Sequence, residues 1–301
     1  MKIIQDVGKN REKIISSISK FGFLPEHNYY HFLCKQTKSK RCVFFDFGQK
    51  RGLMAVFNKN NSVFYVVNGI LAPRGEMADI FLKFADYVFL KKKAKKISVE
   101  AGEDFKTEVF KKLKNSKYKA SLNYSLHWPI FNLQGLDEKL KGRQWKKFRN
   151  IRNRFYNHSL IEVKDPRRID KNILKSILFS WLKRRHPRDR VDYSYYLNVI
   201  DNKFEGFDMV RALEMDNEIC SFSAGWKIPN SNDFYWSIGI FNYRHKDMGE
   251  FVNLDDFMFL KKRGYKKIDL GGSDKAILDF KKKFKPEKIY KTCIFSISRK
   301  K

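Results

Sequence analysis

Cysteine, proline and glycine are scarce in this chain. Its 301 residues include four cysteines, seven prolines and 16 glycines, and no two cysteines form a Cys-x-x-Cys pair. These counts exclude a disulfide framework and a zinc finger, and they are typical of a reduced, intracellular protein. They also exclude collagen-like and linker-like chains.

Long apolar runs are missing as well. No window reaches the roughly 18 apolar residues that a transmembrane helix needs, and the best candidate, 63–71, is expected to be a buried strand. The first twenty residues have neither the apolar core nor the cleavage site of a signal peptide. We therefore expect a cytoplasmic protein that is soluble or bound by charge alone to the inner face of a membrane.

Basic residues far outnumber acidic ones. The chain has 63 Lys and Arg against 33 Asp and Glu, a net charge of +30, and 16% of its residues are aromatic. So many aromatic side chains can bury a large core, which excludes disorder. The charge favours nucleic acid, anionic lipid or phosphate-rich molecules as partners, although solvated lysines would give the same total. The basic residues cluster in two segments, 139–154 and 182–190.

An internal repeat relates the two halves of the chain at an offset of about 170 residues. The copy from Gly69 reads GILAPRGEMADIFLKFADYVFLKKKAKKISVEAGED, and the copy from Gly239 reads GIFNYRHKDMGEFVNLDDFMFLKKRGYKKIDLGGSD. Chance similarity of two Lys- and Phe-rich stretches is the alternative. The shared order of strand, turn, helix, strand and helix favours a duplication.

Each copy has the pattern of an α/β unit. Apolar and aromatic runs predict strands at 62–70 and 233–240, and helical spacing predicts helices at 76–93 and 249–263. Further predictions are strands 97–99 and 268–270, meanders over 41–57 and 209–226 with a hairpin turn at Asp216-Asn217, and helices 136–155 and 171–185. The predicted fold class is α/β (α+β): two tandem units, each a mixed sheet flanked by helices, over residues 1–135 and 136–301.

Three motifs resemble those of a known superfamily. They are HWPIFNLQGLDEKLKGRQWKKFRNIRNRF from His127, EFVNLDDFMFLKKRGYKKIDLGGS from Glu250 and LDFKKKFKPEKIYKTCIFS from Leu278. With the order of elements, they resemble a duplicated GNAT (N-acyltransferase) fold. More narrowly, they resemble the C-terminal domain of lysylphosphatidylglycerol synthases and the Fem-type aminoacyl- and peptidyltransferases.

The resemblance implies an aminoacyltransferase with aminoacyl-tRNA as donor and no tightly bound cofactor. The chain has neither the membrane domain of the lipid-modifying group nor the coiled-coil insertion of the Fem group, so the acceptor stays open among a lipid headgroup, a peptide and a small molecule. Two alternatives remain. One is an N-acyltransferase that uses acetyl-CoA or another acyl-CoA, and the other is a non-catalytic module that binds tRNA or an anionic surface.

The resemblance also points to catalytic residues. Phe280-Lys281 stands where Fem-type enzymes have a Phe-Lys pair, whose lysine is thought to stabilise charge on the reacting carbonyl. A fixed cation aimed at a developing oxyanion is a large catalytic contribution, although Lys281 could be a solvated lysine in a run of three. Asp247 or Asp274 would assist proton removal from the acceptor, and each could instead be a residue at a helix N-terminus.

Substrate-binding candidates follow the predicted strands of the second unit. Glycines at the end of a strand let backbone approach a ligand closely. Arg244 opens a segment that falls where CoA-dependent GNAT enzymes bind pyrophosphate, but Asp247 replaces the first glycine there and argues against CoA. The full set is Phe280, Lys283, Gly271, Gly272, Ser273, Arg244 and Tyr235.

Anion-binding candidates lie on the predicted basic helix, where a solvated face is the alternative. They are Arg143, Lys146, Lys147, Arg149, Arg152 and Arg154, expected to hold the tRNA backbone or a phosphate group. Histidines and cysteines do not cluster at metal spacing, so no metal is expected. No Gly-x-Ser-x-Gly elbow or Walker loop occurs, which favours direct attack of the acceptor on a bound donor.

Overall fold

The computed structural model describes residues 1–185 and 191–300. Part of the basic segment 182–190 thus lies outside the described residues. The first half contains β1 (Lys2–Ile4), α1 (Arg11–Phe21), α2 (Tyr29–Leu33), β2 (Lys40–Gly48), β3 (Arg51–Asn58), β4 (Val63–Val67), β5 (Ile70–Leu71), η1 (Arg74–Glu76), α3 (Met77–Leu90), β6 (Lys96–Gly102), α4 (Glu103–Leu113) and β7 (Tyr118–Asn132).

The second half begins after a connection in which the expected division at residue 135 falls. Its elements are η2 (Arg143–Trp145), α5 (Lys146–His158), β8 (Ile161–Lys164), η3 (Pro166–Arg168), α6 (Lys171–Lys183), α7 (Tyr193–Asp201), β9 (Met209–Met215), β10 (Glu218–Lys227), β11 (Phe234–Phe241), α8 (Met248–Lys262), β12 (Lys267–Asp269), α9 (Lys275–Lys282) and β13 (Lys288–Arg299). No helix among the described residues combines the length and apolar character that crossing a bilayer requires.

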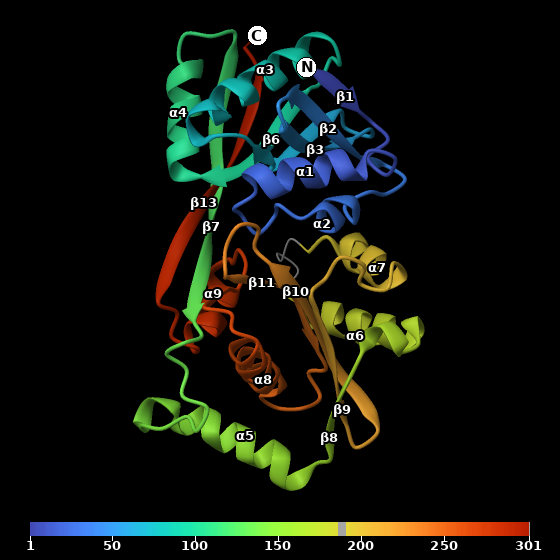
Figure 1. Ribbon diagram of the computed structural model, residues 1–301, viewed down its shortest axis with the longest axis vertical. Helices are drawn as coiled ribbons and strands as arrows, with labels where there is room; N and C mark the ends of the chain where they lie inside the picture. The colour runs from blue at the N-terminus through green and yellow to red at the C-terminus, as the bar shows by residue number, and fades with distance from the viewer. Residues whose placement is uncertain (186–190, 301) are drawn as a thin grey trace.

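All the described strands belong to one mixed sheet that runs the length of the molecule (Figure 1). Their order is β1-β2-β3-β4-β6-β13-β7-β12-β11-β10-β9-β8, with β5 paired to β3. The repeat predicted from the sequence gives the same topology twice, because β4 and β6 pair in parallel around α3, and β11 and β12 do so around α8.

The two halves share their last strands. β13, the last strand of the chain, pairs along its length with β7 and places Thr292–Ile297 against β6 of the first half. β7 in turn places Ile130–Asn132 against β12 of the second half. Each half therefore borrows a strand from the other, so that neither half leaves an open sheet edge at the junction.

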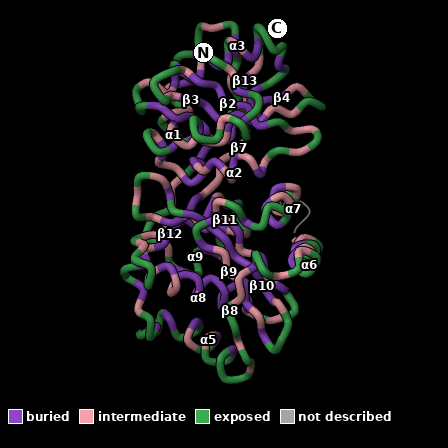
Figure 2. The backbone as a smooth tube through the Cα atoms, turned by 45° about the vertical axis from the view of Figure 1, so that its right-hand side comes forward, coloured by how far each residue is buried: buried purple, intermediate pink, exposed green. Residues whose placement is uncertain are grey.

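Side-chain alternation explains why helices cover both faces of the sheet. In the first half, Val43 and Phe45 pack in the core with α3, whereas the neighbouring Phe44 packs in the core with α1. In the second half, α6 and α7 lie on one face, and α5 and α8 on the other. Figure 2 shows the buried residues running along the strands and through α8.

Most predicted elements match within a few residues, and two differ for backbone reasons. The helix expected over 136–155 begins at Lys146, because Leu140 (φ 52°) and Gly142 (φ 91°) have left-handed backbone that an α-helix excludes. The strand expected over 62–70 breaks at Asn68 (φ 46°) into β4 and β5. The turn at Asp216-Asn217 is confirmed, since both residues have the positive φ of a type I′ hairpin.

Candidate active site

A cavity opens where two parallel strands of the second half separate. β11 and β12 pair only at Phe234–Ile268 and Tyr235–Asp269. β12 then ends while β11 continues to Phe241. In the first half, by contrast, β4 and β6 stay paired over five residues. The cavity has a volume of about 1660 Å³ and is lined by residues from both halves. A ligand site at the carboxyl ends of diverging strands is common in α/β sheets.

Lys281, the predicted oxyanion-binding residue, lies in the cavity wall. It belongs to the last turn of α9 and is only 9% exposed. Its amine donates hydrogen bonds to the carbonyl oxygens of Leu270 and Gly271, the second at 3.0 Å. Burial, aided by the Arg185 guanidinium, lowers the pKa of Lys281 to about 7, against the opposing effect of Asp269 and Asp274. These two hydrogen bonds engage two protons of the amine, and no further hydrogen bond of this nitrogen is formed within residues 1–185 and 191–300, which leaves its third position for a ligand.

Asp269 at the end of β12 fixes the turn whose carbonyl groups bind Lys281. Its carboxylate accepts a hydrogen bond from the Tyr290 hydroxyl at 2.7 Å and one from the Gly271 amide at 2.8 Å. Burial raises the pKa of Asp269 to about 6, even though the hydrogen bonds and Lys281 lower it. Gly271 has φ 80°, a conformation that favours glycine and turns the chain after β12.

The other residues of the predicted glycine loop, 272–274, pack against neighbouring elements, and some of them also line the cavity. A Cβ on Gly272 would lie 2.9 Å from the Trp128 ring, so the backbone packs directly on this tryptophan. Ser273 forms a β-bridge with His127. Asp274 accepts a hydrogen bond from the Ile277 amide at 3.2 Å and caps α9, while it also lines the cavity.

Tyr235 and Phe280 line the same cavity. The Tyr235 ring packs edge-on against Trp226, and burial raises its pKa well above the ordinary value. A Cβ on Gly271 would lie 3.4 Å from the Tyr235 hydroxyl and 3.8 Å from the Lys281 amine, so both polar groups lie on the side of the glycine from which a side chain would project. Sequence reasoning thus named two donors, Tyr235 and Lys281, that the fold brings together.

The start of α8 is rich in carboxylates. Asp247 has φ 62° and forms an ion pair with Arg154 at 3.0 Å. Glu250, one turn into the helix, is buried and pairs with Lys283 at 2.9 Å. Lys283 is therefore occupied by an acidic partner. Arg244 is exposed and does not line the cavity.

The predicted anion-binding arginines are held by the protein itself. Arg149 donates to the carbonyl oxygens of Leu140 and Gly142, and Arg152 donates to that of Glu138 at 2.6 Å. Arg154 binds the loop before α8. Their guanidinium groups therefore hold the connection before α5 and the loop before α8 against α5. Arg143, Lys146 and Lys147 keep exposed side chains, and Lys147 lies 3.8 Å from Glu250.

Sequence reasoning missed a group of ionisable residues contributed by the first half. Glu100 and Lys35 line the cavity, and Glu26 lies beside them with one carboxylate oxygen that has no hydrogen-bond partner in the described residues. Burial and the nearby Glu100 raise the pKa of Glu26 to about 8. The repeat could have pointed to this group. Glu100 aligns with Gly271 of the second copy, a residue that the sequence already placed in the candidate site.

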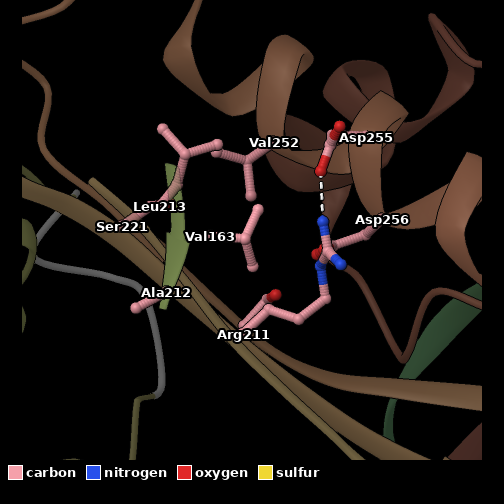
Figure 3. A pocket seen from close by; sticks show the side chains of 9 residues that line it. Val163, Arg211, Ala212, Leu213, Ser221, Val252, Asp255 and Asp256 are labelled. Atoms are coloured by element: carbon pink, nitrogen blue, oxygen red, sulfur yellow. Dashed lines mark hydrogen bonds and ion pairs between the residues drawn. The ribbon is translucent and has the colours of Figure 1, made fainter. Parts of the chain in front are cut away.

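A second, much smaller cavity of about 10 Å³ lies beneath α8 (Figure 3). There Arg211 of β9 forms ion pairs with Asp255 and with Asp256, the second at 2.9 Å. Trp236 donates to Asp256 at 3.0 Å. The space holds no more than one water molecule, so these charges form a structural network and not a ligand site.

The pKa of Lys281 gives a stability prediction. Lys281 has an ordinary pKa of 10.5 and a pKa of about 7 when folded, so the unfolded chain binds one more proton between these values. The free energy of unfolding of the wild type should therefore rise with pH in this window, by up to about 1.4 kcal/mol per unit relative to Lys281→Met. Urea titrations at pH 7, 8 and 9 measure this difference. The exposed Lys262→Met is the control, and a pH-independent difference for Lys281→Met would contradict the lowered pKa.

Comparison with known proteins identifies the fold. Neither the protein-family models nor the curated protein sequences contain a match to the chain. Among solved structures, L-PGS from Bacillus licheniformis has a TM-score of 0.66 and 15% identity, over 96% of this chain and 91% of that one. FemX gives a TM-score of 0.61 and 13% identity, over 97% of each chain.

A tandem GNAT protein from the clavulanic acid biosynthesis pathway gives a TM-score of 0.56 and 8% identity, over 99% of this chain and 98% of that one. Identities this low establish a shared fold and no more. Both the predicted fold class and the resemblance are confirmed at that level: the chain has the mixed α/β fold of two tandem GNAT-like units that L-PGS, FemX and tandem GNAT proteins share.

Proposed function

We propose that this protein is an aminoacyltransferase that moves an aminoacyl group from charged tRNA to an amine or hydroxyl acceptor. The observation that carries the proposal is the Lys281 amine, which is buried in the cavity wall and fixed by the carbonyl oxygens of Leu270 and Gly271. A buried cation held in one position is suited to stabilise the oxyanion that forms when a carbonyl is attacked.

The proposed reaction is a direct displacement. The acceptor nitrogen or oxygen forms a bond to the ester carbonyl carbon, and the carbonyl oxygen becomes an oxyanion held by Lys281. The carbon–oxygen bond to the tRNA ribose then breaks, and that ribose oxygen takes a proton. We assign the acceptor proton to Asp247 or Asp274, because both residues line the cavity. Asp247 also pairs with Arg154, and Asp274 also caps α9.

The charge distribution supports tRNA over CoA as donor. The pyrophosphate of CoA needs free amide groups and positive potential at a helix N-terminus. Here Asp247 and the buried Glu250 supply negative charge at the start of α8. Elsewhere the cavity wall carries basic side chains, including Arg184, Lys246 and Lys275, and the chain as a whole is strongly basic.

The carboxyl groups of the first half support a substrate that carries an amine. Glu26 and Glu100 lie close enough for the charge of Glu100 to raise the pKa of Glu26. A bound ammonium group would favour the ionised form of both carboxyl groups. Either the α-amine of the aminoacyl donor or an acceptor amine would provide it.

The first experiment titrates the purified protein with charged tRNA, uncharged tRNA and acetyl-CoA at near-physiological salt. We expect tighter binding of charged than of uncharged tRNA, because only the former places an aminoacyl ester in the cavity. Equal binding of both would favour a module that binds only the tRNA backbone. Saturable binding of acetyl-CoA together with weak tRNA binding would support the acyl-CoA alternative.

A further inference from the structure

Three side chains with metal-binding atoms lie close together next to the loop before α8. Glu218 and Cys220 belong to the start of β10, and His245 belongs to the loop between β11 and α8. One ligand atom from each lies within 4.8 Å of the other two. His245 also lines the cavity.

The backbone aims these side chains at one point. Glu218 and Cys220 are two residues apart on a strand and so share a face. The register between β10 and β9 shifts between Ile219 and Ser221, so Cys220 is the extra residue of a β-bulge, a device that re-aims side chains. The buried Asn242 connects the loop before α8 to the start of β10. Its backbone amide donates to the Cys220 carbonyl at 2.7 Å, and its side-chain amide donates to the Glu218 carboxylate at 3.3 Å.

The distance between two of the donors fits a metal ion without rearrangement. Cys220 Sγ lies 3.5 Å from His245 Nε2. A tetrahedral zinc ion with bonds of about 2.3 Å to sulfur and about 2.05 Å to nitrogen separates those atoms by about 3.6 Å. The Glu218 side chain is exposed and can turn to supply the third ligand, which leaves the fourth position for water.

We propose that Glu218, Cys220 and His245 form a zinc-binding site. Thiolate, imidazole and carboxylate are the donors that zinc takes in proteins. As the ion binds, the Cys220 thiol loses its proton to solvent, and the new bonds join β10 to the loop before α8. The site departs from the expectation of no metal, and it does not depend on the proposed transfer reaction.

Cobalt(II) provides the test, because it occupies zinc sites and gives coloured complexes with thiolate. Metal-free protein is titrated with cobalt(II) in the absence of any substrate. We expect one equivalent to give a thiolate charge-transfer band and tetrahedral visible bands, and one equivalent of zinc to abolish both. Cys220→Ser should remove the charge-transfer band. His245→Ala should weaken binding by roughly 100-fold or more, because loss of even an outer-shell partner typically costs about 10- to 100-fold. The buried Cys34→Ala, which lies in a different core, is the matched control.

Two results would overturn the proposal. One is the lack of a charge-transfer band in the wild type, and the other is a band that survives in Cys220→Ser but disappears in Cys34→Ala. Should Cys220→Ser fail to fold, Glu218→Gln decides the question, because this exposed substitution leaves the strand intact. We expect it to weaken cobalt binding by roughly 10-fold or more, and unchanged binding would exclude the three-residue site.

Discussion

Lys281→Ala is expected to lower the turnover of the transfer reaction by at least about 100-fold, with a change of no more than about threefold in donor affinity. The reason is that the oxyanion exists only during the reaction. An interaction made only then lowers turnover when it is lost and leaves ground-state binding almost unchanged. Removal of a single oxyanion donor typically costs about 10²- to 10³-fold in turnover.

The pH profile gives a second readout of the same role. Burial lowers the pKa of Lys281 to about 7 in the free protein. If the protonated amine is the working form, the ratio of turnover to Michaelis constant should fall as pH rises through about 7. A lysine that only supported the loop after β12 would not impose this falling limb.

Single-turnover kinetics with charged tRNA would separate donor binding from chemistry. Lys262→Ala is the control, because this exposed lysine lies on α8 and does not line the cavity. Unchanged turnover in Lys281→Ala would remove the oxyanion role. A loss of donor affinity as large as the loss of turnover would instead make Lys281 a binding residue.

The sequence was most informative about the second half. The repeat predicted the order of β11, α8, β12 and α9, and the Phe280-Lys281 pair pointed to a residue that does line the cavity. The first signal combines the repeat with the local spacing of apolar residues, and the second comes from the resemblance to Fem-type enzymes. The burial of Lys281 was not predictable, since its amine binds the carbonyl oxygens of Leu270 and Gly271 at a turn that needs φ 80° at the glycine.

The long-range features could not be read from local patterns. The halves share strands because β13 pairs with both β6 and β7: Cys293 lies opposite Ala101 on one side and opposite Ser125 on the other. No spacing rule in the sequence encodes such a register. The basic helix shows a different limit. Arg149 and Arg152 donate to carbonyl oxygens of the preceding connection, a structural role that their composition could not show, and their role in anion binding stays a prediction.

Arg211→Met is expected to lower the free energy of unfolding by about 3–5 kcal/mol at pH 8. In the wild type Arg211 pairs with Asp256, which is 2% exposed, and with Asp255 (Figure 3). Methionine fills similar space but leaves the Asp256 charge buried without its cationic partner. Loss of one member of a buried pair is far more costly than loss of an exposed pair.

The loss should shrink in acid. Burial raises the pKa of Asp256 to about 6, although Arg211 lowers it, so the carboxyl group is mostly protonated at pH 5. A carboxyl group with a raised pKa favours the folded state at low pH, and this advantage disappears as pH rises through the folded pKa. Without Arg211 that pKa moves higher still. The stability difference between the variant and the wild type is therefore small at pH 5 and largest at pH 8.

Chemical denaturation at pH 5 and pH 8 measures both effects. The control is Lys175→Met, which breaks the partly exposed pair with Asp201 at 2.6 Å and should change stability by no more than about 1 kcal/mol at either pH. A deficit for Arg211→Met as small as that of the control would show that the Asp256 charge is not held by Arg211. A large deficit of equal size at both pH values would instead assign the loss to packing against Phe259, over whose ring the guanidinium lies at 4.2 Å.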